Sequence, residues 1–360
     1  MNTSTLYLHI PYCRQACHYC DFHFSTQRST ESALLEAMRN EITLRANQTP
    51  WSGTTLSSLY FGGGTPSFLD TAEIARLIAH AKSLFSFSST IEITLEANPD
   101  DITPEKLEAW HSMGITRLSV GLQSFDDHDL RSMNRAHNAA HSVQCLKWIA
   151  EGSIENYSVD FMYGMPGSSV ESWKDQLDLL ATYLPPHLSC YALTVEEKTV
   201  LHHQINSGET SQPSDEIIVA QFEALRAWAG LHGYTHYELS NFALPNKHSR
   251  HNSHYWSGRP YLGVGPGAHS FDGAQRWWNV SNNTLYAQGA EVPCEKLTVV
   301  DLLNERLMVR LRTSEGFRWE TDVPNTLGGP ELEVLQRSVD RATSKGRLQK
   351  TSNGFVIPPE

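Results

Sequence analysis

The chain has 360 residues, of which 40% are hydrophobic and 19% charged, a balance typical of globular proteins. Its formal net charge of −12 argues against broad affinity for nucleic-acid phosphates, so we expect no nucleic-acid partner. No stretch approaches the roughly 18 consecutive apolar residues of a membrane span, and the N-terminus carries no secretory signal. We therefore expect a cytoplasmic protein, with at most peripheral membrane contact, whose thiols stay reduced.

Short apolar segments alternate with amphipathic helical patterns over the first two thirds of the chain. The patterns predict six strands, at residues 6–10, 57–61, 91–96, 115–121, 157–162 and 187–194. They also predict helices over 30–46, 70–84, 103–114 and 217–231. Such alternation indicates βαβ units and a parallel sheet. The predicted fold class is α/β, a partial or complete (β/α) barrel, and the sequence leaves its closure open.

The character of the chain changes twice after this barrel region, which we place at residues 1–235. Residues 236–294 are rich in histidine, aromatic residues and glycine, and six of the chain's 17 histidines fall between His232 and His269. Residues 295–360 contain helical patterns over 301–311 and 331–342 and a hairpin signal at Asn353-Gly354. Element order alone predicts a small α+β C-terminal domain of winged-helix-like character there.

Three cysteines lie on the loop that leaves the first predicted strand. Cys13, Cys17 and Cys20 have the spacing Cys-x-x-x-Cys-x-x-Cys. Three thiolates on one short loop suit a [4Fe–4S] cluster with three irons held by the protein and one left open. We expect the rest of the chain to be organised around that open iron.

A zinc site is the alternative for these cysteines. Structural zinc usually needs a second pair of ligands well downstream, whereas the remaining cysteines are isolated from one another, namely Cys145, Cys190 and Cys294. His18 and His23 lie close enough in sequence to complete a tetrahedral site, so zinc stays open at this point. A disulfide framework is not expected in a cytoplasmic chain of this size.

The predicted strands end in residues suited to ligand binding, and barrels carry their chemistry at these ends. Gly62-Gly63-Gly64-Thr65-Pro66 follows the second strand, where glycines let the backbone approach a ligand or simply make a tight turn. The run matches no phosphate-binding pattern. Glu96, Gln123 and Asp160 are polar groups at three other strand ends, and Arg135 offers a planar fork for a carboxylate. Taken singly, each carboxylate could equally be a solvent-exposed group at a strand end with no role in ligand binding.

Together these motifs resemble the radical S-adenosylmethionine (SAM) family, in the branch of the oxygen-independent coproporphyrinogen III oxidases and the HemW-type heme chaperones. The resemblance runs from Tyr7 to about Phe271 and includes Glu96-Ala-Asn-Pro, Gly121-Leu-Gln-Ser-Phe and Asp160-Phe-Met-Tyr-Gly. It implies a TIM-like barrel of the radical SAM type, in which the three cysteines hold a [4Fe–4S] cluster and SAM ligates the fourth iron. The SAM-site residues that it implies are Tyr7, Tyr19, Gly63, Gly64, Thr65, Glu96, Gln123, Arg135 and Asp160.

Two departures separate the chain from the oxidases of that branch. The oxidases carry a fourth cysteine two residues after the third, where this chain has Phe22, and an N-terminal extension before the first strand. The chain has instead His251-Asn252-Ser-His-Tyr255-Trp256, which resembles the His-Asn-x-x-Tyr-Trp heme-binding motif of the chaperones. A histidine nitrogen is an axial ligand for heme iron, and aromatic rings pack on a porphyrin.

The resemblance therefore implies a heme chaperone that binds heme and transfers it to apo-heme proteins. We expect His251 to ligate the iron beside Asn252, Tyr255 and Trp256, with His248 and His254 as competing ligands. The cluster and SAM would support binding, dimerisation or release. The alternatives are an oxygen-independent coproporphyrinogen III oxidase, a radical SAM decarboxylase, and a radical SAM methyltransferase. The sequence leaves open the heme recipient, the cleavage of SAM and the formation of a homodimer.

Overall fold

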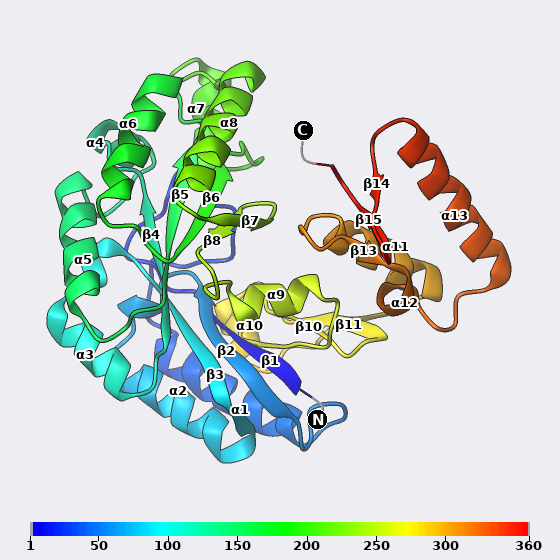
Figure 1. Ribbon diagram of the computed structural model, residues 1–360. Helices are drawn as coiled ribbons and strands as arrows, with labels where there is room; N and C mark the ends of the chain where they lie inside the picture. Colours follow the sequence, from blue (N-terminus) through cyan, green and yellow to red (C-terminus); the bar gives the residue numbers. More distant parts are fainter. Residues whose placement is uncertain (1–2, 359–360) are drawn as a thin grey trace.

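The computed structural model describes residues 3–358, and a nine-stranded sheet forms its centre (Figure 1). Residues 1–2 and 359–360, the outer ends of the predicted first and last domains, lie outside the described residues. Six parallel strands follow chain order: β1 (Thr3–Ile10), β2 (Thr55–Gly63), β3 (Ser86–Ala97), β4 (Arg117–Gln123), β5 (Tyr157–Tyr163) and β6 (His187–Ala192). The six predicted strands are all present.

The sheet does not close on itself. In the order β7-β8-β6-β5-β4-β3-β2-β1-β9, strand β9 (Leu262–Val264) pairs with β1 in parallel. At the opposite edge, β8 (Asn241–Ala243) and β7 (Thr235–Glu238) add antiparallel strands beside β6. Within residues 3–358, β1 and β6 are therefore not paired, and the fold is a partial (β/α) barrel.

Helices that follow the parallel strands lie along the outer side of the curved sheet (Figure 1). They are α1 (Glu31–Ala46), α2 (Thr71–Leu84), α3 (Pro104–Ser112), α4 (Asp127–Ser132), α5 (Ala139–Glu151), α6 (Val170–Ala181), α7 (Val200–Ser207) and α8 (Asp215–Leu231). The predicted caps are confirmed, because the side chain of Asp70 accepts from the backbone of α2 and that of Thr103 from the backbone of α3. The inner stripe of α1, with Leu34, Met38 and Ile42, is completely buried against the sheet.

The segment after α8 crosses the open side of the barrel. It contains α9 (Arg250–Trp256), α10 (Asn283–Ala287) and a small antiparallel sheet of β10 (His269–Phe271), β11 (Gln275–Trp278) and β12 (Cys294–Lys296). Helix α9, which carries the His-Asn-x-x-Tyr-Trp motif and was not predicted as a helix, packs against β2. The motif thus lies on the inner side of the sheet, opposite the helical layer.

The C-terminal segment has a hydrophobic cluster of its own, built on Leu303, Phe317 and Phe355. Its elements are α11 (Val299–Arg310), β13 (Phe317–Arg318), α12 (Trp319–Asp322), α13 (Gly329–Ser344), β14 (Gln349–Lys350) and β15 (Gly354–Val356). The predicted hairpin is present, but its turn is not Asn353-Gly354. Gly354 begins β15, where the carbonyl oxygen of Phe317 leaves no room for a Cβ atom.

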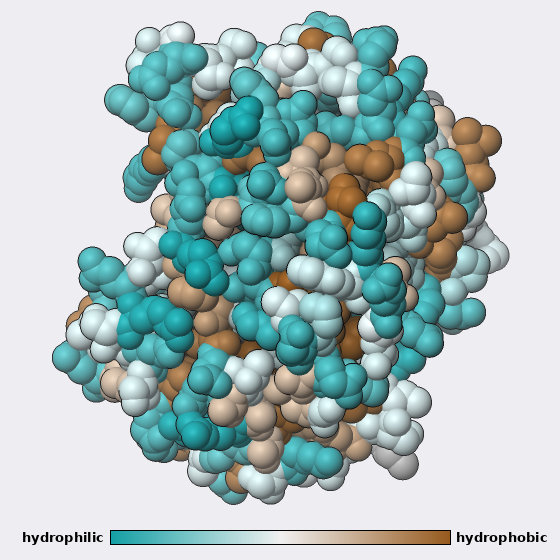
Figure 2. Space-filling model, turned by 90° about the vertical axis from the view of Figure 1, so that its left-hand side faces the viewer, coloured by the Kyte–Doolittle hydropathy of each residue, from teal (hydrophilic) through white to brown (hydrophobic). Residues whose placement is uncertain are grey.

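The face made by the outer helices is hydrophilic over most of its area, and hydrophobic side chains show there as separate small groups (Figure 2). Such scattered groups are normal on protein surfaces and mark no extended apolar contact site. Among the helices described, none combines the length and the apolar character needed to cross a bilayer.

Candidate functional site

The cysteine loop runs directly alongside the glycine-rich end of β2. The backbone N–H of Gly64 donates to the carbonyl of Ile10 at 2.8 Å, and that of Thr65 donates to the carbonyl of Tyr12 at 2.8 Å. A Cβ atom on Gly64 would lie 2.9 Å from the backbone of this segment, so the close approach requires glycine. The two motifs that the sequence separates by some 50 residues therefore form one structure, as expected for a shared barrel mouth.

The donors around the cysteines fit a cluster. All three thiols are free and partly buried. The Thr65 hydroxyl donates to Cys13 Sγ at 3.5 Å, and Arg135 Nη1 donates to Cys17 Sγ at 3.4 Å. Hydrogen bonds and positive charge at the sulfurs stabilise thiolates that bind iron. Burial, with the neighbouring Cys17 and Cys20, raises the pKa of the Cys13 thiol to about 11 despite the bond from Thr65, so its thiolate needs a cation beside it.

The spacing of the sulfurs argues against a single zinc ion. Among residues 3–358, the three cysteines form no group, with or without His18 and His23, whose ligand atoms all lie within 4.8 Å of one another. A tetrahedral zinc ion with Zn–S bonds of about 2.3 Å would hold its thiolates about 3.8 Å apart. In a [4Fe–4S] cluster each thiolate binds a different iron, which requires a wider spacing.

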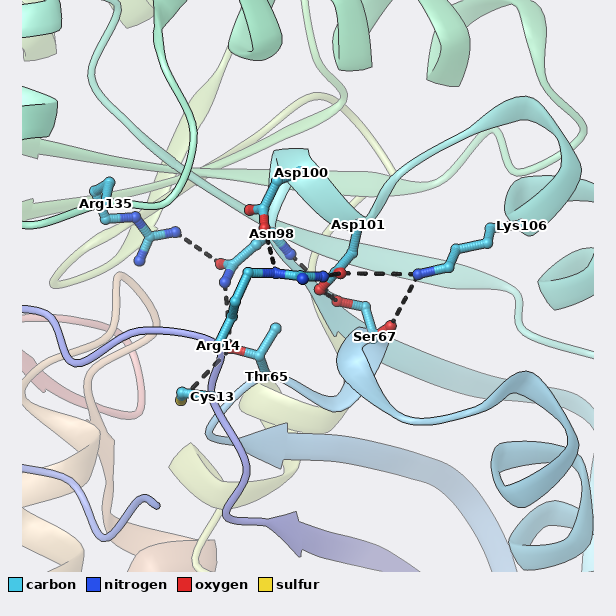
Figure 3. Close-up of polar contacts among 9 residues, drawn as sticks. All are labelled: Cys13, Arg14, Thr65, Ser67, Asn98, Asp100, Asp101, Lys106 and Arg135. Atoms are coloured by element: carbon cyan, nitrogen blue, oxygen red, sulfur yellow. Dashed lines mark hydrogen bonds and ion pairs between the residues drawn. The ribbon is translucent and has the colours of Figure 1, made fainter. Parts of the chain in front are cut away.

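Arg14, between the first two cysteines, fastens the loop to η2 (Pro99–Asp101), the 3₁₀ turn that follows β3 (Figure 3). Its Nε donates to Asp100 at 3.0 Å and its Nη2 to Asp101 at 2.9 Å. The Asp101 carboxylate is 2% exposed and also accepts from Ser67 at 2.9 Å. The position of the loop is thus set before any cofactor binds, by residues that the sequence analysis did not single out.

Asn98 connects Thr65 with Arg135 (Figure 3). Its Nδ2 donates to Thr65 Oγ1 at 3.2 Å, and its Oδ1 accepts from Arg135 Nη2 at 2.7 Å. Arg135 Nη2 also donates to the Gly121 carbonyl at 2.8 Å, whereas its Nε is buried without a partner among the described residues. The guanidinium that we expected to bind a carboxylate is therefore largely engaged by the protein, because its bonds to Cys17, Asn98 and Gly121 use three of its N–H groups.

Glu96 is half-buried at the end of β3 and faces the end of β2. It accepts the Tyr60 hydroxyl at 2.8 Å and the Gly63 N–H at 3.1 Å. Burial raises the pKa of Glu96 to about 7. Tyr7 of β1 stacks on Tyr60, with ring centroids 5.9 Å apart and planes at 27°. Gly63 has a φ of +109°, and a Cβ atom there would overlap the His9 ring, so position 63 requires glycine.

Asp160 and Gln123 lie on the neighbouring strands. Asp160 accepts from Ser119 at 3.3 Å and from Ser158 at 3.4 Å, and burial raises its pKa to about 6. Gln123 has a φ of +68° at the point where the β4–β5 register shifts. A residue other than glycine in this left-handed region stores strain, which proteins concentrate at functional sites.

Tyr19 lies apart from these strand-end residues. It lines a cavity of about 440 Å³ between the cysteine loop, α4 and α7, together with Met133, Met165, Leu193 and Leu201. Of the predicted SAM-site residues, Tyr19 alone belongs to this lining. Its side chain is connected to the others through a hydrogen bond with Arg135.

His251 is buried inside the barrel, 2% exposed. Its ring stacks on Tyr60 with centroids 4.7 Å apart, and its Nδ1 lies 2.8 Å from Ser58 Oγ. Both carboxylate oxygens of Glu92 hold the start of α9, accepting the N–H groups of Arg250 at 3.2 Å and His251 at 3.0 Å. Nε2 of His251 is buried and has no hydrogen-bond partner among the described residues. Burial lowers the pKa of this imidazole well below its usual range, so the ring is neutral.

The two competing histidines are placed differently. Nε2 of His254 is 2.8 Å from the Pro260 carbonyl and is thereby occupied. His248 is exposed and stacks on Tyr237 with centroids 4.1 Å apart. The arrangement around His251, with one ring nitrogen anchored and the other free, is the one typical of a metal-binding histidine.

The other residues of the motif border cavities on the open side of the barrel. Asn252, Tyr255 and Trp256 line a cavity of about 360 Å³ with Tyr191 and Leu239. The Tyr255 ring, which lines this cavity, makes an edge contact with the buried His251 ring, with centroids 5.0 Å apart.

The sequence alone assigned no role to six residues of the site, namely Arg14, Ser58, Tyr60, Glu92, Asn98 and Asp101. Period-two alternation along β2 and β3 was a usable signal for three of them, because Ser58 and Tyr60 share a face with Gly62, and Glu92 shares one with Glu96. Asn98 stands in the Glu96-Ala-Asn-Pro motif, which was its signal, whereas Arg14 and Asp101 have none.

Comparison with known proteins identifies the family of the chain. The family model described as the radical SAM superfamily matches residues 7–180. The heme chaperone HemW of Bacillus subtilis (strain 168) is 34% identical over 371 aligned positions, covering 98% of this chain and 97% of that protein. HemW of Mycobacterium tuberculosis (strain ATCC 25618 / H37Rv) is 33% identical, covering 87% of this chain and 82% of that protein.

Among solved structures, coproporphyrinogen III oxidase (HemN) from Escherichia coli, a radical SAM enzyme, superposes with a TM-score of 0.84 over 99% of this chain and 86% of that one. Its sequence identity is 23%, so this likeness concerns the fold alone. The radical SAM superfamily implies a [4Fe–4S] cluster and SAM, and the cysteine loop and strand-end residues fit both groups. On the identity and coverage of its curated relatives, the chain belongs to the HemW family of the radical SAM superfamily.

Proposed function

We propose that this protein is a cytoplasmic heme chaperone that binds heme through His251 and transfers it to apo-heme proteins. The observation that carries the proposal is the state of the imidazole. Ser58 Oγ anchors Nδ1 at 2.8 Å, and Nε2 is buried with no hydrogen-bond partner within residues 3–358. A neutral imidazole that donates from Nδ1 has its lone pair on Nε2, the nitrogen that would ligate heme iron.

Side chains around His251 provide aromatic surfaces and a cavity for a porphyrin. Tyr255 and Trp256 offer aromatic faces to a porphyrin, and Asn252 lines the same cavity of about 360 Å³. Because His251 is 2% exposed, heme reaches Nε2 only when neighbouring side chains move. The edge contact of Tyr255 makes its ring the first side chain that must turn.

The cluster and SAM have residues ready to hold them. Cys13, Cys17 and Cys20 would hold the [4Fe–4S] cluster, and the Glu96 carboxylate, held at the glycine run by the N–H of Gly63, would accept a hydrogen bond from SAM. A cluster with one open iron supplies a binding point for SAM and an electron source. We propose that these groups support heme binding, release or dimerisation. Phe22, 70% exposed where the oxidases of the branch carry a cysteine, favours the chaperone over the enzyme.

Hemin titration tests the heme site directly. The wild-type protein should form a stable complex followed by its Soret absorption, and His251→Ala should lose it. His254→Ala is the matched control, since it alters a histidine on the same helix whose Nε2 is occupied. The loaded protein should then pass its heme to an apo-globin. An unchanged complex in His251→Ala would sink the proposed ligand.

A second assay separates the chaperone from the oxidase. The reconstituted, reduced protein is incubated with SAM and coproporphyrinogen III, and the porphyrinogens are separated by chromatography. We expect no decarboxylation. Formation of protoporphyrinogen would overturn the chaperone proposal in favour of the enzyme.

A further inference from the structure

One face of β2 connects the heme ligand to the candidate SAM site. Side chains alternate along a strand, so Ser58, Tyr60 and Gly62 all point into the barrel. Ser58 contacts His251, and Gly62 lies against Glu96, where a Cβ atom would come within 2.8 Å of the carboxylate. The two ends of this face are four residues, or about 13 Å, apart.

β3 repeats the arrangement. Glu92 accepts the N–H of His251 at 3.0 Å and so fixes the start of α9. Glu96, on the same face of the strand, accepts from Tyr60 and Gly63. Each of the two strands therefore holds the heme motif at one position and the candidate SAM site four residues further on.

Tyr60 contacts both sites, and Tyr7 of the candidate SAM site also lies near the His251 ring, with centroids 6.3 Å apart. The Tyr60 hydroxyl donates to Glu96 Oε1 at 2.8 Å, while its ring stacks on His251 at 4.7 Å with planes at 30°. The ring is enclosed, because Tyr7 stacks on it at 5.9 Å and a Cβ atom on Gly62 would touch it at 2.8 Å. A change at Glu96 that shifts or fixes the Tyr60 hydroxyl is therefore transmitted to the plane of the imidazole.

We propose that Tyr60 is a positioning residue that couples the two sites, so that SAM bound at Glu96 increases the affinity of His251 for heme. This inference rests on the proposed function of His251 and of the strand-end SAM site. A ligand that donates to Glu96 favours its ionised form, which accepts the Tyr60 hydroxyl more strongly and holds the ring against His251. By linkage, heme increases the affinity for SAM by the same factor.

The test is the ratio of hemin dissociation constants without and with SAM, measured on cluster-reconstituted protein. We expect SAM to tighten hemin binding at least about fivefold in the wild type, at the low end of typical coupling. Tyr60→Phe keeps the ring but loses the bond to Glu96, and its ratio should fall below about twofold. Tyr234→Phe is the matched control, because it removes another buried hydroxyl bond, to the Pro185 carbonyl, and should keep the wild-type ratio.

A second measurement, the position of the Soret band, distinguishes loss of coupling in Tyr60→Phe from a general structural change in that variant. SAM should shift the Soret band of the wild-type hemin complex and leave that of Tyr60→Phe unmoved. A ratio of one in the wild type, or an unchanged ratio in Tyr60→Phe, overturns the coupling while the heme site stands. Failure of the wild type to bind hemin at all overturns the proposed function and the coupling with it.

Discussion

The guanidinium of Arg14 and the carboxylate of Asp101 lie 2.9 Å apart and join the cysteine loop to the turn after β3. The two partners differ in environment, since the Arg14 side chain is 49% exposed and the Asp101 side chain 2%. Asp101 has two further partners, Ser67 at 2.9 Å and Lys106 at 3.7 Å. The buried Asp101 carboxylate is thus held in place by several partners, and Arg14 binds the cysteine loop to it.

Loss of Arg14 should loosen the cluster. Arg14→Gln removes two charge-assisted bonds to η2, and we expect about 1–2 kcal/mol less unfolding free energy together with lower iron content after reconstitution. Arg39→Gln is the control, because it removes ion pairs to Glu36 on α1 and Glu73 on α2, neither of which belongs to the cysteine loop, and should leave iron content unchanged. Equal iron content and equal cluster lifetime in air for Arg14→Gln and wild type would contradict this role.

Substitution of Cys13, Cys17 or Cys20 should remove the cluster, whereas substitution of an isolated cysteine should not. Cys17→Ala removes a thiolate that already accepts from Arg135, and we expect loss of the cluster absorption and of most bound iron. Cys294→Ala, an exposed cysteine on β12, should retain both. Iron and sulfide analysis, together with absorption spectra, measures the cluster content of the two variants. A complete cluster in Cys17→Ala would remove the premise of the metal centre.

Glu96 should make stability depend on pH. Its pKa is raised to about 7, above the unfolded value of 4.5, so the folded state holds the proton more tightly and loses stability as the pH rises from about 4.5 to 7. Glu96→Gln removes this penalty, so the variant should gain about 3 kcal/mol relative to the wild type between pH 5 and pH 8. Denaturant unfolding across that range measures the difference. A difference between Glu96→Gln and the wild type that stays constant across that range would refute the argument.

The neighbouring serines of β2 offer a matched pair for the heme ligand. Ser58→Ala frees Nδ1 of His251, and loss of such a support typically weakens metal binding 10- to 100-fold, so hemin affinity should fall in about that range. Ser57 points to the other face, where its hydroxyl donates to the Ser4 carbonyl, and Ser57→Ala should leave hemin binding unchanged. Equal affinities in the two variants would show that Ser58 does not orient the ring.

The barrel strands and the cysteine loop were predictable because their signals are local. Apolar runs of four to eight residues, polar strand ends and cap residues depend on neighbours in the chain, and all six predicted strands are present. The division at residues 235 and 294 stays a prediction. The C-terminal hairpin shows the limit of local signals, since its turn is displaced by the contact of Gly354 with β13, a strand that lies almost 40 residues away.

What the sequence by itself determined is the chemistry of the donors: three thiolates for a cluster, polar strand ends, and a histidine motif for heme. Only the tertiary structure decided how they are joined. Ser58 meets His251 across 193 residues, and Arg14 meets Asp101 across 87. Such contacts depend on the curvature of the sheet and on the path of α9 across its open side. No periodicity along the chain encodes either, so the connection through Tyr60 is visible only in the fold.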